Sequence, residues 1–178
     1  MKLKILNIHG YGGRPQNAAC IALQENGCTD IVSPSIDYDA AAPDVILGRL
    51  RKTVEEEGIE LIVGTSIGGF FAAVLSAEYD LPVILVSPFL PQIMSVTEYT
   101  KPYITFFNTL SRTNVVNVSC IAGDDDESLS DHQLARELFF NERYKSIPGG
   151  KHSGFTLPLK EYFGEVLSYY AELLLSDK

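Results

Sequence analysis

The sequence predicts a three-layer α/β/α sandwich with a mainly parallel sheet of about six strands. Short apolar runs alternate with segments of helical periodicity, as in strands joined by crossover helices. The run 81–88 is apolar apart from Ser87 and too short for a helix, which is typical of a parallel strand buried on both faces. Glycine turns follow four of the expected strands, at Gly10, Gly64, Gly123 and Gly149. Because parallel strands end at one edge of a sheet, these turns should gather there.

Composition favours one globular domain spanning residues 1–178, with 46% apolar residues. The net charge of -9 argues against a nucleic-acid partner. No apolar run approaches the roughly 20 residues of a membrane-spanning helix. Residues 1–8 are too short and too alternating for a secretory signal, so a cytoplasmic location is expected.

Three cysteines, Cys20, Cys28 and Cys120, form no Cys-x-x-Cys pair. An odd number without such a pair argues against both a disulfide framework and a zinc ribbon. We expect the three thiols to pack as small residues in a reduced protein.

The first third of the chain alternates strand and helix. Residues 2–8 predict a strand that ends in a His-Gly turn. A helix at 16–26 stops at a glycine, and a short strand follows at 29–32. A second helix is expected at 44–57, with these residues facing inward: Val45, Leu47, Leu50 and Val54.

The stretch 60–73, ELIVGTSIGGFFAA, predicts a strand, a sharp turn and a helix with one serine at the apex. Gly64 and Gly68 lie two residues either side of Ser66, where a tight turn brings neighbouring backbones together. Such a turn exposes the Ser66 hydroxyl and aims the Ile67 amide at whatever the serine attacks.

The segment 89–114 has no clean period and is rich in aromatic residues. A lid or pocket wall, packing over the sheet edge and a subunit contact all fit this pattern, and the sequence does not specify the oligomeric state. The remaining elements are expected to be a strand at 115–122, a helix at 131–141, a strand at 143–147 and a helix at 159–175.

A serine hydroxyl needs a nearby base to become a nucleophile. His152 lies in a glycine-rich loop after the last expected strand, where it can lie over the Ser66 turn. The other histidines, His9 and His132, fall at a strand end and a helix start. We therefore predict His152 as the base.

The base needs an orienting carboxylate, which the loop after residue 122 supplies as Asp124, Asp125 and Asp126. We favour Asp126 and keep Asp124 as the alternative. Consecutive aspartates do not fit the alternating ligand spacing of a calcium loop, so no metal is expected.

Two N–H donors are needed to stabilise an oxyanion. The Ile67 amide is one candidate. The Tyr11 amide is the other, because its strand is expected to lie beside the serine strand.

A phosphate-binding loop is the main functional alternative for the glycine turn. No Gly-Lys-Ser/Thr ending follows, and the spacing is wrong for a dinucleotide fingerprint. No cofactor is therefore expected.

Taken together, the motifs resemble the α/β-hydrolase superfamily, and within it the small YqiA-like esterases. The similar features occur in order: the His-Gly turn at residue 9, the Gly-Thr-Ser-Ile-Gly-Gly stretch, Ser-Pro at 87–88, the Gly-Asp loop and the late histidine. The resemblance implies a minimal α/β-hydrolase fold and a serine hydrolase with Ser66 as nucleophile, His152 as base and Asp126 as acid.

The substrate implied is a small-molecule ester, and the short chain favours small acyl groups. A thioesterase or amidase would use the same residues. A binding module that keeps the fold without turnover is the alternative from another class.

Overall fold

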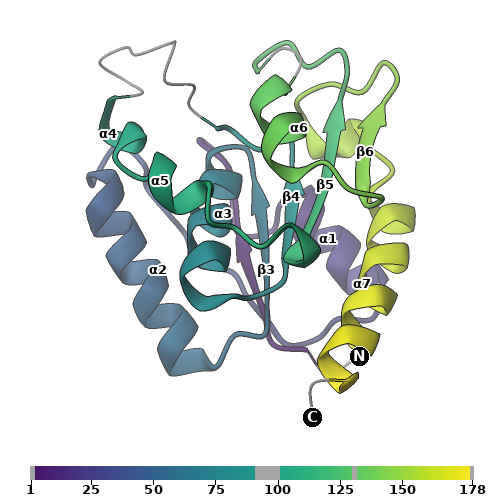
Figure 1. The fold of residues 1–178 in the computed structure, drawn as a ribbon, viewed down its shortest axis with the longest axis horizontal. Helices are drawn as coiled ribbons and strands as arrows, with labels where there is room; N and C mark the ends of the chain where they lie inside the picture. The colour runs from purple at the N-terminus through teal and green to yellow at the C-terminus, as the bar shows by residue number, and fades with distance from the viewer. Residues whose placement is uncertain (1–2, 91–100, 130–131, 177–178) are drawn as a thin grey trace.

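The computed structural model describes residues 3–90, 101–129 and 132–176 (Figure 1). Its centre is a six-stranded sheet in the order β2-β1-β3-β4-β5-β6, and every neighbouring pair is parallel. The strands are β1 (Ile5–Ile8), β2 (Ile31–Val32), β3 (Leu61–Thr65), β4 (Val83–Val86), β5 (Val118–Gly123) and β6 (Tyr144–Ile147). The predicted three-layer sandwich with a parallel sheet is confirmed.

Helices cover both faces of the sheet (Figure 1). One face packs on α1 (Ala18–Glu25) and α7 (Leu159–Ser176). The other packs on α2 (Pro43–Glu57), α3 (Ile67–Tyr79), α4 (Lys101–Ile104), α5 (Phe107–Leu110) and α6 (Gln133–Phe139). Strand residues alternate between two hydrophobic cores, one on each face of the sheet. Leu61 and Val63 enter the core under α1 and α7, and Ile62 enters the core under α2 and α3. Burial on both faces explains why the central strand β4, VILV, is apolar without interruption.

The strand register brings the carboxyl ends together. Ile8 pairs with Gly64, Thr65 with Val86, and Gly123 with Ile147. The loops that follow these strands therefore lie along one edge of the sheet, as predicted.

One of the four α2 residues predicted to face inward, Val45, was predicted wrongly by one position. Val45 is 44% exposed, and Ile46 is buried in its place. Ile46 and Leu50 are four residues apart and stack on one face, whereas Val45 lies off that stripe.

The strand expected at 115–122 is wrong at its start. Residues Val115–Asn117 form a 3-10 turn, η2, and β5 begins at Val118. The Asn114 side chain accepts a hydrogen bond from the Val116 N–H at 3.2 Å, and this local cap competes with extension of the strand.

Part of the segment 89–114, residues 91–100, lies outside the described residues, as do the expected element ends at 2 and 131. The described part packs onto α3. Tyr103 is buried, with its ring 5.1 Å from Phe70 and 5.8 Å from Phe89.

All three cysteines are free and buried, as expected. Among the described helices, none has both the length and the apolar character needed to cross a bilayer.

Candidate active site

Ser66 occupies the turn between β3 and α3 with φ 54° and ψ -122°. A positive φ at a non-glycine residue typically costs about 1–3 kcal/mol and persists where the surroundings impose it. Here the Ser66 N–H donates to the Val86 carbonyl at 3.0 Å, and the Ser66 carbonyl accepts from Gly69 and Phe89, each at 2.9 Å. The turn is therefore fixed by main-chain hydrogen bonds on both sides of the serine.

The two flanking glycines are required by close backbone approach. A Cβ on Gly64 would lie 2.4 Å from the Gly68 carbonyl oxygen, and a Cβ on Gly68 would lie 2.3 Å from the Ile8 carbonyl oxygen. Neither contact can be relieved by a side-chain rotation, because the neighbouring atoms are backbone. The Gly-x-Ser-x-Gly pattern is thus a packing requirement of β1, β3 and α3.

His152 joins the serine to the acidic loop. Its Nε2 lies 3.0 Å from Ser66 Oγ, and its Nδ1 lies 2.8 Å from Asp126 Oδ2. An ionised carboxylate only accepts hydrogen bonds, so Nδ1 carries the proton. The unprotonated Nε2 then faces the Ser66 hydroxyl, which is the arrangement a general base needs.

The Asp126 carboxylate is buried and accepts at both oxygens. Its Oδ1 accepts from the Ser128 and Leu129 N–H groups, each at 2.8 Å. Burial alone raises the pKa of this carboxyl. Hydrogen bonds from His152, the Leu129 amide, His132 and the Ser128 amide outweigh burial, and the pKa lies below its usual value. Asp126 is therefore ionised at neutral pH.

The neighbouring acids contact other parts of the His152 loop. Asp124 accepts from the Gly149 N–H at 2.7 Å, and Glu127 accepts from the His152 N–H at 3.1 Å. Asp125 forms an exposed ion pair with Lys151. The structure thus brings Asp126 to the imidazole, and it places Asp124, the alternative acid, on the loop backbone.

The His-Gly turn lies against the serine. Gly10 is so close that an added Cβ would lie 3.0 Å from Ser66 Cβ, and β1 pairs with β3 as expected. Tyr11 follows in this turn; its side chain is exposed, and its hydroxyl donates to Asp39 at 2.8 Å. Ile67 is the first residue of α3, and the first N–H groups of a helix have no intrahelical acceptor.

A second imidazole, that of His132, contacts Asp126, and this contact was not predicted from the sequence. His132 Nε2 lies 2.7 Å from Asp126 Oδ2, on the same oxygen that meets His152. His9, by contrast, is buried with Nε2 accepting from the Ile36 N–H at 3.0 Å, which makes it part of the loop packing. The only sequence signal for His132 was its position six residues after Asp126, in a turn where histidine tolerates positive φ.

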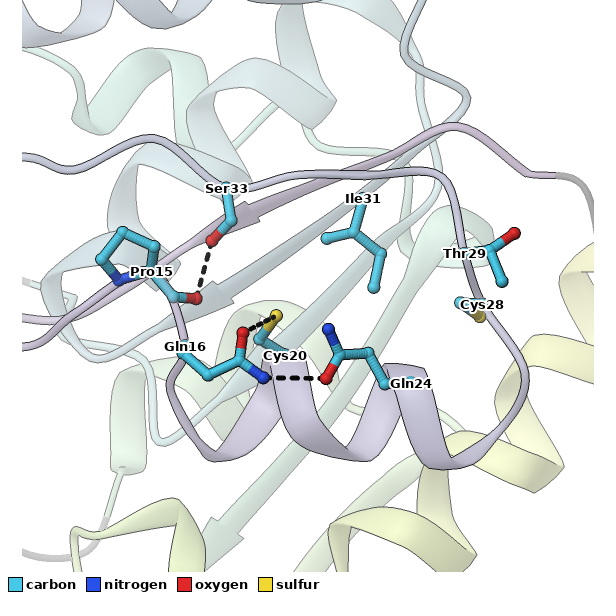
Figure 2. A pocket seen from close by; sticks show the side chains of 8 residues that line it. All are labelled: Pro15, Gln16, Cys20, Gln24, Cys28, Thr29, Ile31 and Ser33. Atoms are coloured by element: carbon cyan, nitrogen blue, oxygen red, sulfur yellow. Dashed lines mark hydrogen bonds between the residues drawn. The ribbon is translucent and has the colours of Figure 1, made fainter.

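A separate cavity of about 420 Å³ lies between α1 and β2 (Figure 2). Its lining carries no charged side chain and consists of Pro15, Gln16, Cys20, Gln24, Cys28, Thr29, Ile31 and Ser33. Burial raises the pKa of the Cys20 and Cys28 thiols, so neither is an activated nucleophile. Within the described residues, no three His, Cys, Asp or Glu side chains form a group that could hold a metal ion.

The fold is shared with known α/β hydrolases. Est1E from Butyrivibrio proteoclasticus aligns with a TM-score of 0.69 at 17% identity, over 94% of this chain and 89% of that one. A structure from the work on LipS and LipT, two metagenome-derived lipolytic enzymes, aligns with a TM-score of 0.67 at 15% identity, over 97% and 95%. A structure from the work on carboxylesterases of Nitrososphaera gargenis aligns with a TM-score of 0.63 at 13% identity, over 99% of this chain and 92% of that one. The chain thus has the α/β-hydrolase fold, as its motifs suggested.

The family can be stated more narrowly. The chain belongs to the uncharacterised protein family UPF0227, whose model matches residues 4–133. The matched region includes the His-Gly turn, the Ser66 turn between β3 and α3 (the elbow) and the acidic loop, and it ends before His152. The resemblance to the small YqiA-like group is confirmed.

Proposed function

We propose that this protein is a serine carboxylesterase. The observation that carries the proposal is the continuous hydrogen-bonded series from Ser66 Oγ to His152 Nε2 at 3.0 Å and from His152 Nδ1 to Asp126 Oδ2 at 2.8 Å. Serine, base and orienting acid in this geometry are the machinery of acyl transfer. Lipolytic enzymes and carboxylesterases among the structural neighbours support the same class.

In the first half of the reaction, Ser66 Oγ attacks the ester carbonyl carbon while His152 Nε2 takes the hydroxyl proton. Asp126 stabilises the imidazolium that forms. The Ile67 and Tyr11 amides are the proposed donors to the oxyanion. The tetrahedral intermediate then collapses, the ester C–O bond breaks, and the alcohol leaves with the proton from His152.

In the second half, water attacks the acyl group on Ser66 and gives its proton to His152 Nε2. Collapse of the second tetrahedral intermediate breaks the bond to Ser66 Oγ, which recovers the proton, and the acid is released. These steps need no group beyond the side chains and amides named.

The proposed substrates are small esters with short acyl chains. Support comes from the described part of the segment between β4 and β5. Its Tyr103 ring is buried against Phe70 and Phe89, so this part of the segment packs onto α3, and the short chain leaves few other residues to build a deep acyl pocket.

Hydrolysis of nitrophenyl esters of increasing acyl length tests the proposal. Purified protein should hydrolyse acetate and butyrate esters, and Ser66→Ala should lower the rate by about 10⁴-fold or more. Faster hydrolysis of long-chain than of short-chain esters would overturn the preference for short acyl groups. Equal rates for wild type and Ser66→Ala would overturn the proposed nucleophile.

A further inference from the structure

We propose that His132 is a positioning residue for the Ser66–His152–Asp126 unit, acting through Asp126. The inference deepens the proposed function and rests on it. His132 touches the carboxylate and is assigned no contact with substrate.

The first observation is that four donors fill the acceptor positions of one carboxylate. Oδ1 accepts from two backbone N–H groups, and Oδ2 receives His152 Nδ1 at 2.8 Å and His132 Nε2 at 2.7 Å. A carboxylate offers about four lone-pair sites. Since His152 must move charge and protons during turnover, His132 is the second anchor that keeps Oδ2 in place when the His152 bond changes.

The second observation is that His132 adopts a left-handed backbone conformation and turns its ring toward Asp126. It has φ 50° and ψ 33°, and it stands at the N-cap position of α6, yet its side chain caps no N–H of that helix. The ring is instead turned inward, with 2% of the side chain exposed, beside an Asp126 side chain that is fully buried. A conformation of this kind persists when the surrounding structure imposes it.

The chemical consequence is a division of the negative charge on Oδ2 between two imidazoles. The N–H that His132 donates to Oδ2 withdraws negative charge that would otherwise act on the His152 ring alone. Other charged groups beside His152 are Glu127, which accepts its N–H, and the exposed Lys151–Asp125 pair. None of these is altered by a change at His132, so the effect of His132 can be isolated.

Two substitutions separate positioning from packing. His132→Leu removes the donor, whereas His132→Gln keeps a side-chain N–H that can reach Asp126 and cannot ionise. We expect His132→Leu to lower kcat for a short-chain nitrophenyl ester by about 10- to 100-fold with little change in KM, the range one hydrogen bond to a charged group covers. His132→Gln should stay within about threefold of wild type.

The pH profile supplies the readout that packing alone would not move. With His132→Leu, the acid limb of kcat/KM should shift to higher pH, because the undivided Asp126 charge favours protonated His152. Glu137→Gln, an exposed position on α6, is the matched control and should leave both kcat and the profile unchanged. Melting temperatures of all variants establish that each protein is folded.

The proposal is overturned if His132→Leu keeps the wild-type kcat and acid limb. It is also overturned if Leu and Gln variants lose equal activity with no shift of the limb, which would mark a purely structural role. An NMR titration of the His152 ring needs no substrate, and its midpoint should be higher in His132→Leu than in wild type. If the protein has no esterase activity, that titration still tests the coupling, so failure of the proposed function is distinguishable.

Discussion

Ser66 Oγ and His152 Nε2 lie 3.0 Å apart, but the two residues are held in different ways. The serine is positioned by main-chain packing: its backbone conformation, its hydrogen bonds to Val86 and Phe89, and the glycine contacts all involve backbone atoms. His152 is positioned by side chains from the acidic loop, chiefly Asp126.

This difference predicts how each half of the site responds to change. Replacing Gly64 or Gly68 with a larger residue must disturb the junction of β1, β3 and α3, so it acts on folding. A substitution among the acidic side chains leaves the backbone in place, so it acts mainly on chemistry. Substitutions in the acidic loop and at the elbow glycines, each with a control, test that separation.

The largest effect is expected from Asp126→Asn. An amide facing His152 Nδ1 favours the tautomer in which Nε2 carries the proton, so the imidazole can no longer accept one from Ser66. We expect kcat/KM for a short-chain nitrophenyl ester to fall by about 10⁴-fold.

Asp124→Asn is the matched control for this prediction. Asp124 bonds the Gly149 N–H, which an Asn side-chain oxygen can still accept, so activity should stay within about threefold of wild type. An equal loss in both variants would show that the loop acts as a block and that Asp126 has no separate role.

The second effect concerns the elbow. In Gly68→Ala, the added Cβ would meet the Ile8 and His9 carbonyl oxygens at 2.3 and 2.5 Å. Because both neighbours are backbone, we expect the free energy of unfolding in urea to fall by about 3 kcal/mol or more.

Gly48→Ala is the control for that substitution. Gly48 lies in the exposed part of α2 with open space around its Cα, so alanine should raise the free energy of unfolding by up to about 1 kcal/mol. If Gly68→Ala folds with wild-type stability, the Ser66 turn is not held by backbone contact, and the proposed difference between how Ser66 and His152 are held is wrong.

The smallest effect is the pH dependence of stability. The pKa of Asp126 is lower in the folded protein than its ordinary value of about 3.9. The stabilisation it supplies is therefore fully present above about pH 4 and is lost as the pH falls through the lowered folded pKa.

Urea unfolding of wild type and Asp126→Asn at several pH values measures this effect. Wild type should be more stable by about 1–3 kcal/mol at neutral pH, and the gap should close below about pH 4. A gap that stays constant down to pH 3 would contradict the ionised, hydrogen-bonded carboxylate.

Much of the fold could be predicted because its causes are local. The strand ends, Gly64 and Gly68 follow from steric rules that act over a few residues, so the elbow was recognisable from the sequence. The prediction that Val45 faces inward was wrong by one position, because the buried face of α2 depends on the rotation of the helix about its own axis where it packs on the core.

The site was less predictable where side chains from distant loops meet. The sequence favoured Asp126 but left Asp124 open as the acid, because the path of the loop decides which one reaches His152. His132 was missed for the same reason, because its contact with Asp126 depends on a positive-φ turn that has no unique sequence pattern.

Labelling with a fluorophosphonate probe tests whether Ser66 is an activated nucleophile. Folded wild-type protein should be labelled on one residue, and mass spectrometry should assign the label to Ser66. Labelling should be lost in Ser66→Ala and strongly slowed in Asp126→Asn. Absence of labelling of the folded wild type, or a label on a different residue, would show that Ser66 is not the nucleophile.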